Sequence, residues 1–549
     1  MPVIEVRIWD IERLVGEPLT YRDIESSLEL LKAEVEDVKG DTLTFEASHD
    51  RPDLFSAEGI GRAIRYLRRL SVESSSRYRE IGCSDSVYLE LTRTPGYRPY
   101  AYAIVVRGVE LDDEALKQLF QLQEKLHLTY CGDRRLVSIG LYDLEKVSPP
   151  LRYTAVSNAR FTPLDGEREM DLPEILRATE KGVMYAHLVK KGEYPLLVDS
   201  KGTVLSFPPI INSEETRVTE ETKNVVVDVT GIEPRLMAKA LVLIATSVAE
   251  RGRNPRIELV RIVGEEPNEP ERIIRGRYIS LDGRILEKVL GFKPLNHELK
   301  DTLLRMGYEV VSEGDDHVTV WVPPYRVDVI REVDVVEDIA IGYGYGRIVA
   351  ESPPPTHEGS ISRVERLSEL LRDVMIGLGF NEVVNFMLVD KEILARTSTS
   401  VFVELENPKL RTYSALRNSL IPSMLLTASI NVNSFGRFKV FEIGDYVVVR
   451  NGKPLNSRSL AFCILDSEVT LTDGLVAIKS ILRTLGIEYR LREAKLRPFI
   501  DGRAAEVVIP SGEVIGVVGE VQPEILVSLG INKPVVIGEI YVSKLLNVV

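Results

Sequence analysis

Four acidic residues lie close together in the stretch "PPYRVDVIREVDVVEDIAIGYGYGRI", residues 323–348: Asp328, Asp334, Glu337 and Asp338. If a helix runs from about 330 to 343, then Asp334, Glu337 and Asp338 stand at positions i, i+3 and i+4 and share one face. Carboxylates this close repel one another, and we expect only Arg331 and the more distant Arg347 to offset them. The cluster therefore needs compensation, either by a hard cation with oxygen ligands or by water.

A second group of polar residues surrounds an aspartate in a run of valines. In the strand predicted for "NVVVDVTG", Val225, Val227 and Val229 point to one side, and Val226, Asp228 and Thr230 point to the other. A carboxylate among valines is costly to bury without a partner. The hairpin sequence before it supplies Ser206, Asn212, Ser213, Glu214 and Thr216. Such a set either lines a pocket that orients a substrate hydroxyl and a water, or forms a turn rich in side-chain caps.

The elements that position these residues belong to a chain of ordinary globular composition. Of its 549 residues, 44% are hydrophobic and 28% are charged, and this length suggests roughly three or four domains. The sequence has no apolar run long enough to span a bilayer and no signal peptide, so we expect a cytoplasmic protein without membrane contact. Cys83, Cys131 and Cys463 form no metal motif and fit a reducing compartment. The net charge of -14 argues against non-specific coating of nucleic acid, but it leaves room for a local basic surface.

Three linker-like stretches, "SSSRYREIGCSDS", "GEEPNEPER" and "ESPPPTHEGS", divide the chain into four predicted segments. Residues 1–84 form an α+β domain, in which Arg62, Arg65 and Arg69 share one helix face that is either solvated or contacts phosphate. Residues 85–268 alternate strand-like and helix-like stretches and form a second α+β domain. A small α+β module follows at 269–352, and 356–549 combines an antiparallel sheet with helices. The predicted fold class is therefore α+β with several domains.

Standard catalytic motifs are missing from the sequence. "GYGYG" (342–346) suggests a phosphate loop, but it follows a helix and lacks the strand–loop–helix context, so we expect a helix to end at Gly342 or Gly344. There is no G-x-S-x-G, H-E-x-x-H or C-x-x-C pattern. Nucleophilic and zinc chemistry of the usual kinds therefore have no support.

Several motifs resemble the signatures of the phenylalanyl-tRNA synthetase beta subunit family. The acidic stretch is similar to the family's "P-x-x-R-x-D" followed by a "D-x-x-E-[DE]" helix and "YGY". "HDRPDLFSAEGIGRAIRYL" is similar to the N-terminal "NRPDLLSxEGxAR" motif, with His49-Asp50 where an Asn is usual. "VLSFPPIINSEETRVTEETKNVVVDVTG" resembles the editing module of the archaeal and eukaryotic branch, and "ENPKLRTYSALRNSLIPSMLLTASINVN" followed by "FKVFEIG" resembles the C-terminal domain. These matches span nearly the whole chain, in the family's order.

The resemblance implies a compact beta subunit of the archaeal type. Residues 356–549 would form a class II synthetase-like antiparallel core, residues 85–268 an editing domain, and residues 269–352 a small winged-helix-like module. The core would be catalytically silent, because "GRFKVFEIG" lacks the "F-R-x-E" arginine and "TDGLVAIKSILRTLG" lacks the "G-x-G-x-x-R" pattern of class II catalysis. It would support an alpha subunit, which binds ATP and phenylalanine and charges tRNA(Phe) within an α2β2 heterotetramer.

The resemblance also implies two sites. Asp328, Asp334, Glu337 and Asp338 match positions that are assigned in the family as magnesium ligands between subunits, although Asp328 need not share an ion with the others. An arginine of the alpha subunit is the alternative compensation. The editing domain would hydrolyse mischarged tyrosyl-tRNA(Phe), since a phenylalanine pocket cannot always exclude tyrosine. Asp228, Ser213 and Asn212 are the candidate catalytic residues there, with Ser206 and Thr230 behind them.

Two other classes of function remain open from the sequence. One is a non-catalytic tRNA-binding scaffold that has lost its alpha partner, which failure to copurify with an alpha chain would favour. The other is a free-standing deacylase built on the same editing domain. The intact C-terminal core argues against the deacylase, because a hydrolase alone would not need it.

Overall fold

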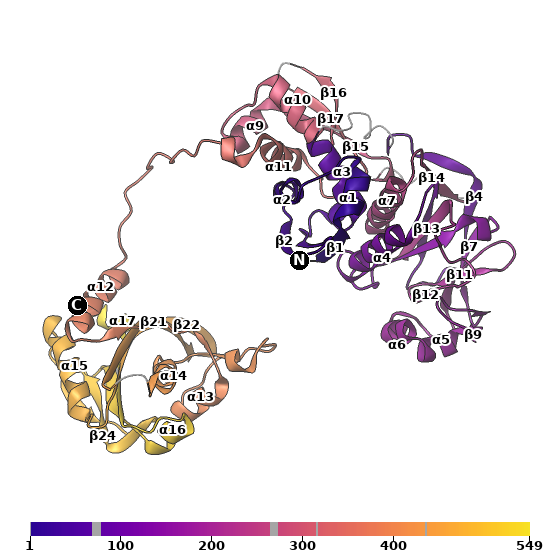
Figure 1. The fold of residues 1–549 in the computed structure, drawn as a ribbon. Helices are drawn as coiled ribbons and strands as arrows, with labels where there is room; N and C mark the ends of the chain where they lie inside the picture. The colour runs from indigo at the N-terminus through magenta and orange to yellow at the C-terminus, as the bar shows by residue number, and fades with distance from the viewer. Residues whose placement is uncertain (1, 69–77, 264–272, 315–316, 434–435, 549) are drawn as a thin grey trace. The chain divides into compact units, whose positions relative to one another are not determined.

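The computed structural model describes residues 2–68, 78–263, 273–314, 317–433 and 436–548 (Figure 1). The chain divides into two compact units, Met1–Glu351 and Ser352–Val549. The larger sheets have three, nine and three strands in the first unit and seven strands in the second. The prediction of a mixed α and β protein with several domains is therefore confirmed.

The N-terminal part of the first unit is a three-stranded antiparallel sheet with three helices. Its strands lie in the order β1-β3-β2, with bounds Val3–Arg7 (β1), Thr42–Glu46 (β3) and Glu34–Lys39 (β2). Its helices are α1 (Ile8–Val15), α2 (Tyr21–Leu30) and α3 (Ala57–Leu67). The side chain of Ser56 accepts a hydrogen bond from the backbone N–H of Gly59 and so caps the start of α3.

A nine-stranded sheet forms the centre of the first unit. Its order is β12 (Ile211–Asn212), β11 (Val204–Phe207), β10 (Tyr194–Val198), β7 (Leu151–Val156), β4 (Gly82–Thr92), β14 (Arg256–Ile262), β5 (Tyr100–Arg107), β13 (Asn224–Gly231) and β6 (Val137–Asp143). Neighbours pair antiparallel except at β4, which is parallel to both β14 and β7. The predicted segment boundary at 84/85 falls inside β4. The helices here are α4 (Asp113–Leu128), α5 (Leu172–Ala178), α6 (Glu180–Tyr185) and α7 (Pro234–Glu250).

Strand β13 separates two hydrophobic cores. Val225, Val227 and Val229 are buried in the core that includes α7, and Val226 is buried in a second core on the other face of the sheet. Asp228 alternates onto the face of Val226, as the sequence predicts. A hairpin around Lys201-Gly202 joins β10 to β11, which pair antiparallel. The valine alternation thus fixes the side of the sheet on which Asp228 lies.

A small module follows at residues 273–347. Its sheet order is β15 (Arg277–Asp282), β17 (His317–Val322) and β16 (Glu309–Glu313), and its helices are α9 (Gly283–Leu290), α10 (Asn296–Arg305) and α11 (Glu332–Tyr343). Helix α11 ends at Gly344, whose φ of 99° is accessible mainly to glycine. The prediction that "GYGYG" marks the end of a helix is therefore confirmed.

The second unit is built on a seven-stranded sheet. Its order is β18 (Asn381–Glu382), β21 (Phe438–Arg450), β22 (Lys453–Leu465), β26 (Val535–Ile540), β25 (Val514–Val521), β24 (Phe499–Val508) and β23 (Arg490–Glu493). All pairs are antiparallel except β18–β21. Helices α12 (Arg363–Gly377), α15 (Leu471–Thr484) and α17 (Val542–Leu545) pack in one core, and α14 (Ile421–Asn431) and α16 (Pro523–Ser528) pack in another. Alternate residues of β22 enter the two cores, so the sheet is covered on both faces.

The predicted basic face on α3 is wrong for its two described arginines. Arg62 is almost fully buried, with its guanidinium 3.8 Å from the centre of the Tyr325 ring and 3.6 Å from the carboxylate of Glu250. Arg65 also pairs with Glu250, and it donates to the backbone oxygen of Leu14 at 2.6 Å. Arg69 lies outside the described residues. Arg62 and Arg65 therefore join α3 to α7 and to the small module, and they are not free to contact phosphate.

Across the described part of the chain, none of the helices combines the length and apolar composition needed to cross a membrane.

Candidate functional site

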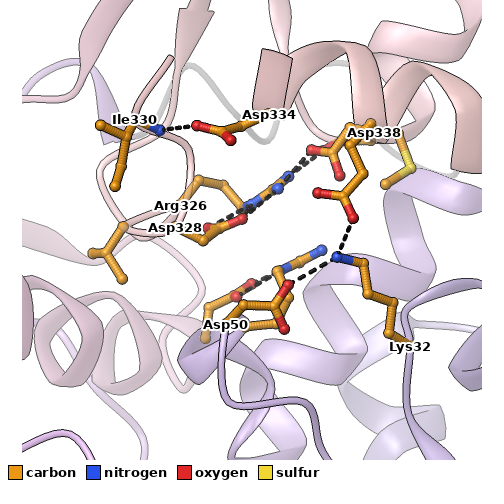
Figure 2. Close-up of polar contacts among 12 residues, drawn as sticks. Lys32, Asp50, Arg326, Asp328, Ile330, Asp334 and Asp338 are labelled. Carbon is orange, nitrogen blue, oxygen red and sulfur yellow. Dashed lines mark hydrogen bonds and ion pairs between the residues drawn. The ribbon is translucent and has the colours of Figure 1, made fainter. Parts of the chain in front are cut away.

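The predicted acidic cluster lies beside Arg326, a residue of the loop before α11 (Figure 2). The guanidinium of Arg326 donates to the carboxylate of Asp328 at 2.7 Å and forms an ion pair with Asp338. All three side chains are largely buried. The hydroxyl of Tyr308 also donates to Asp338. A single buried cation therefore compensates two of the four acids.

The two carboxylates around Arg326 differ in how firmly they are ionised. Burial raises the pKa of Asp338 despite the opposing effect of Arg326 and Arg51. Burial acts on Asp328 in the same direction, but the Arg326 guanidinium outweighs it and holds the pKa of Asp328 below its ordinary value. Asp328 is therefore the more firmly charged partner of Arg326.

The other two acids of the cluster have separate partners. Asp334, in the first turn of α11, accepts hydrogen bonds at 2.7 Å from the backbone N–H groups of Ile330 and Arg331. It therefore satisfies donors that are left free at the start of a helix. Glu337 accepts a hydrogen bond at 2.6 Å from the ammonium of Lys32. Lys32 also contacts Asp50 at 2.8 Å (Figure 2). Lys32 thus connects the small module to the N-terminal domain.

The four acids do not form one magnesium site in this arrangement. Magnesium needs several oxygen ligands at near-octahedral geometry, whereas each acid here already has a nitrogen or hydroxyl partner in this chain. Within the residues that the structure describes, no group of three or more His, Cys, Asp or Glu side chains is placed to hold a metal ion. The expectation that only Arg331 and Arg347 offset the acids is wrong, because Arg326 and Lys32 do so and Arg347 pairs with Glu298. The magnesium assignment stays a prediction.

A cavity of about 320 Å³ opens beside Asp228. Its wall is formed by α4, β6 and the segment from Ser206 to Ser213, with Lys181 and Arg217 also lining it. The side chains of Tyr142, Ser206, Ser213 and Asp228 are buried, whereas Phe120, Asp165, Lys181 and Arg217 are more exposed. The cavity therefore has a buried polar end and an exposed, charged rim.

The buried end is organised by Tyr142 on β6. Its hydroxyl donates to Oδ1 of Asp228 at 2.5 Å and lies 2.8 Å from the hydroxyl oxygen of Ser206. Among the described residues this is the one hydrogen bond that the carboxyl group of Asp228 receives from the protein. The pairing of β13 with β6 sets Asp228 opposite Gly140, two residues before Tyr142 and on the same face. The second carboxylate oxygen of Asp228 is therefore left for a ligand in the cavity.

The other predicted site residues have different surroundings. Asn212 lines the cavity, and its side-chain amide donates to the backbone oxygen of Leu141 at 3.4 Å. Ser213 also lines the cavity, but its hydroxyl accepts from the backbone N–H of Glu215 at 3.2 Å and so caps a turn. Thr230 does not line it; its hydroxyl accepts from Arg98 and contacts Ser138, both at 2.9 Å. The structure thus brings Asp228, Ser206, Asn212 and Ser213 to one cavity and places Thr230 beside it.

One face of α4 holds the edge of the sheet in place. Strand β6 has a neighbour on one side only, so its outward backbone groups need other partners. His127 accepts the N–H of Ile139 at 2.9 Å, and Gln123 donates to the oxygen of Ile139 at 2.7 Å. Burial lowers the pKa of His127 to about 4, so the imidazole is neutral and can accept this hydrogen bond. His127 therefore positions β6 and is not a base for the cavity.

Sequence reasoning missed Tyr142, Gly140 and the α4 face. The signal for Gly140 was a glycine within an apolar strand, which often marks the close approach of another group. A Cβ atom built on Gly140 would lie 2.1 Å from the hydroxyl oxygen of Tyr142 and 2.2 Å from Oδ1 of Asp228. Glycine is therefore required for these two side chains to meet.

We expect Gly140→Ala to disable the cavity without unfolding the chain. The new methyl group forces Tyr142 and Asp228 apart, and a displacement of about 1 Å in a catalytic site costs roughly 10²-fold in rate. Gly96→Ala is the matched control, because a Cβ there meets no atom within 4 Å. Any activity of the cavity should fall in Gly140→Ala alone, and equal rates in the two variants would show that the contact is not needed.

The carboxyl group of Asp228 gives the protein a characteristic pH dependence. Burial raises its pKa from 3.8 to about 7, against the smaller opposing effect of the Tyr142 hydrogen bond. The folded chain therefore keeps a proton that the unfolded chain releases, so this residue makes the free energy of unfolding fall as the pH rises from about 4 to 7.

Asp228→Asn should remove this pH dependence. The free energy of unfolding of the variant minus that of wild type should therefore be larger at pH 8 than at pH 5, by on the order of 2 kcal/mol. Denaturant unfolding at both pH values measures this, with the exposed rim variant Asp165→Asn as control. Parallel pH profiles for wild type and Asp228→Asn would contradict the raised pKa.

Comparisons with known proteins agree along nearly the whole chain. Family models match at residues 117–257 (B3/4 domain), 279–345 (tRNA synthetase B5 domain) and 351–542 (Phenylalanyl tRNA synthetase beta chain CLM domain). The phenylalanine–tRNA ligase beta subunit of Thermofilum pendens is 42% identical, and the alignment covers 99% of this chain and 98% of that protein. The beta subunit of Pyrococcus furiosus is 38% identical, with 99% and 100% covered.

A solved structure is similar to part of the chain. The crystal structure of an N-terminal fragment of the phenylalanyl-tRNA synthetase beta subunit from Pyrococcus horikoshii matches with a TM-score of 0.56 and 34% identity. The match covers 63% of this chain and all of that fragment. The cavity at Asp228 lies within the B3/4 match, and the acidic residues of α11 lie within the B5 match.

Proposed function

Because the chain belongs to the family of phenylalanine–tRNA ligase beta subunits, we propose that its Asp228 cavity hydrolyses tyrosyl-tRNA(Phe). The chain is a subunit of an aminoacyl-tRNA synthetase, and errors of such enzymes between similar amino acids call for a second, hydrolytic site. The observation that carries the proposal is the buried carboxyl group of Asp228 at the closed end of a cavity. A second site of this kind must detect the hydroxyl that distinguishes tyrosine from phenylalanine.

The depth of the polar groups supports a specific role for Asp228. An aminoacyl group that is attached to a tRNA enters a cavity side chain first, because the nucleic acid stays outside. The phenol then reaches the buried end, where Oδ1 of Asp228 is held by Tyr142 and Oδ2 is available to the substrate hydroxyl. A phenylalanyl group would leave this buried carboxyl group without a partner, which costs binding energy. We therefore assign the recognition of tyrosine to Asp228.

Hydrolysis also needs a water held against the ester carbonyl. Asn212 lines the cavity and is half-buried, less deeply placed than Asp228. Its amide group can donate and accept hydrogen bonds, as the orientation of a water requires. We assign this role to Asn212. Ser213 stays a candidate catalytic residue, with the role of fixing the turn that its hydroxyl caps.

The second unit fits a supporting role. Its seven-stranded sheet carries helices on both faces, and its β21 sequence "FKVFEIG" lacks the arginine that class II catalysis uses. In β21, Glu442 forms a buried ion pair with Arg417 at 2.8 Å. We therefore propose a catalytically silent class II-like core, joined to an alpha subunit that binds ATP and phenylalanine in an α2β2 heterotetramer. Such an assembly would act on tRNA(Phe) in the cytoplasm, with residues 273–347 as a winged-helix-like module.

The proposal is tested by comparing two esters of the same tRNA. We would measure the hydrolysis of tyrosyl-tRNA(Phe) and phenylalanyl-tRNA(Phe) by this chain, alone and with its alpha partner. We expect rapid loss of the tyrosyl ester and little loss of the phenylalanyl ester. If the complex charges phenylalanine but hydrolyses neither ester, the chain is a structural and tRNA-binding subunit.

A further inference from the structure

The rim of the Asp228 cavity carries an aromatic side chain that the proposed hydrolysis does not explain. Phe120 lines the cavity, yet 41% of its surface is exposed. It lies on the α4 face that also presents Gln123, Glu124 and His127, at the spacing of one helical stripe. Gln123 and His127 hold the backbone of β6, whereas Phe120 leaves its ring open at the mouth. The exposed end of this face therefore offers an apolar surface to a ligand.

A lysine with little compensation lies at the same rim. The ammonium of Lys181 is 3.7 Å from the carboxylate of Glu124, and its side chain is 46% exposed. That carboxylate already receives the guanidinium of Arg134 at 2.6 Å. By contrast, Arg217 pairs with both Asp165 and Glu214. Of these two cations on the rim, Lys181 is therefore the one whose charge is more available to an anion.

We propose that Phe120 and Lys181 bind the terminal nucleotide of the tRNA, with its base stacked on Phe120 and its phosphate at Lys181. The inference rests on the proposed function, because it needs an aminoacyl ester whose side chain occupies the buried end. The ester links that side chain to the ribose, so the ribose and base must lie at the mouth. Aromatic rings bind bases through stacking, and lysines position nucleic-acid backbones through their phosphates. The rim thus supplies both groups that an adenosine nucleotide needs.

The first experiment measures binding without hydrolysis. The probe is 3′-deoxy-3′-(tyrosylamino)adenosine, an amide-linked analogue that the cavity cannot hydrolyse as an ester, titrated by calorimetry against the full chain. We expect Phe120→Ala and Phe120→Leu to weaken binding roughly tenfold, because both remove the aromatic face on which the base stacks. Phe120→Trp should retain the affinity. Leu128→Ala, at another exposed position of α4, is the control and should bind as wild type does.

The second experiment separates the base from the phosphate. Deacylation of tyrosyl-tRNA(Phe) should show a raised KM and a nearly unchanged kcat in both Phe120→Ala and Lys181→Met. Hydrolysis of tyrosine methyl ester, which has no nucleoside, should be the same in both variants and wild type. Lys181→Met should also bind the phosphate-free amide analogue normally. Arg217→Met is the control, because that cation is already paired.

The outcomes distinguish this inference from the proposed function. If wild type fails to hydrolyse tyrosyl-tRNA(Phe), the proposed function fails, and the subsite survives only if the amide analogue binds with the predicted dependence on Phe120. If wild type hydrolyses the tRNA ester but Phe120→Ala and Phe120→Leu bind and react as wild type does, the subsite is wrong. Equal losses on tyrosine methyl ester would likewise overturn it, since the effect would then lie in the shape of the cavity.

Discussion

Asp228→Ala should lower the rate of tyrosyl-tRNA(Phe) hydrolysis by roughly 10²-fold or more, because it removes the buried group to which we assign the binding of the tyrosine hydroxyl. The loss should be selective: hydrolysis of phenylalanyl-tRNA(Phe) should stay at its low wild-type level or rise. The ratio of kcat/KM for the two esters therefore reports the role of Asp228 directly. Charging with phenylalanine should continue, because the proposed charging site belongs to the alpha subunit.

Two further variants give this prediction a control and a way to fail. Tyr142→Phe keeps the ring but removes the hydroxyl that holds Oδ1 of Asp228, so it should give a smaller loss with the same selectivity. Asp165→Ala changes an exposed carboxylate of the rim and should have little effect. If Asp228→Ala slows both esters equally, Asp228 acts on the water or the ester and does not read the hydroxyl.

Arg326→Gln should destabilise the small module by about 3–5 kcal/mol, the cost of leaving buried charges without their partner. Asp328 and Asp338 both rely on this guanidinium, and the side chain of Arg326 is 2% exposed. Trp321, buried on β17, can report the unfolding of this module, because Trp9 is the other tryptophan and can be replaced by phenylalanine. Urea unfolding followed by Trp321 fluorescence in a Trp9→Phe background measures the effect.

The control for this prediction is an ion pair of the same module on its surface. Arg347 pairs with Glu298 at 2.8 Å, but its side chain is 57% exposed, so Arg347→Gln should leave the urea midpoint nearly unchanged. Replacing Asp328 and Asp338 by asparagine in the Arg326→Gln background should restore part of the lost stability. An Arg326→Gln midpoint equal to that of Arg347→Gln would show that the buried pairs make no net contribution.

Local patterns in the sequence predicted the elements that carry both sites. Alternation of valines placed Asp228 on one face of β13, and the helix predicted from about 330 to 343 is α11, near its observed bounds. Turn chemistry predicted that this helix ends at Gly342 or Gly344, and Gly344 is the observed C-cap. These features depend on neighbours in the chain, so a single sequence contains the information that they need.

The partners of the acidic residues could not be predicted in the same way. Lys32 is 305 positions from Glu337, and Tyr142 is 86 positions from Asp228, so only the tertiary fold brings them together. Arg326 is close to Asp328 in the sequence, yet its burial between two carboxylates depends on the packing of the loop against α11. The same reason explains the error at Arg62 and Arg65, whose helix face is covered by α7 and the small module.

The most direct test of the account is the steady-state level of mischarged tRNA. The proposed complex with the alpha subunit is given tRNA(Phe), ATP and an excess of tyrosine, and tyrosyl-tRNA(Phe) is measured together with ATP consumption. We predict that wild type consumes ATP without accumulating tyrosyl-tRNA(Phe), whereas the complex with Asp228→Ala accumulates it. If the complex with Asp228→Ala consumes ATP and accumulates no more tyrosyl-tRNA(Phe) than wild type, the Asp228 cavity is not the site that removes tyrosine.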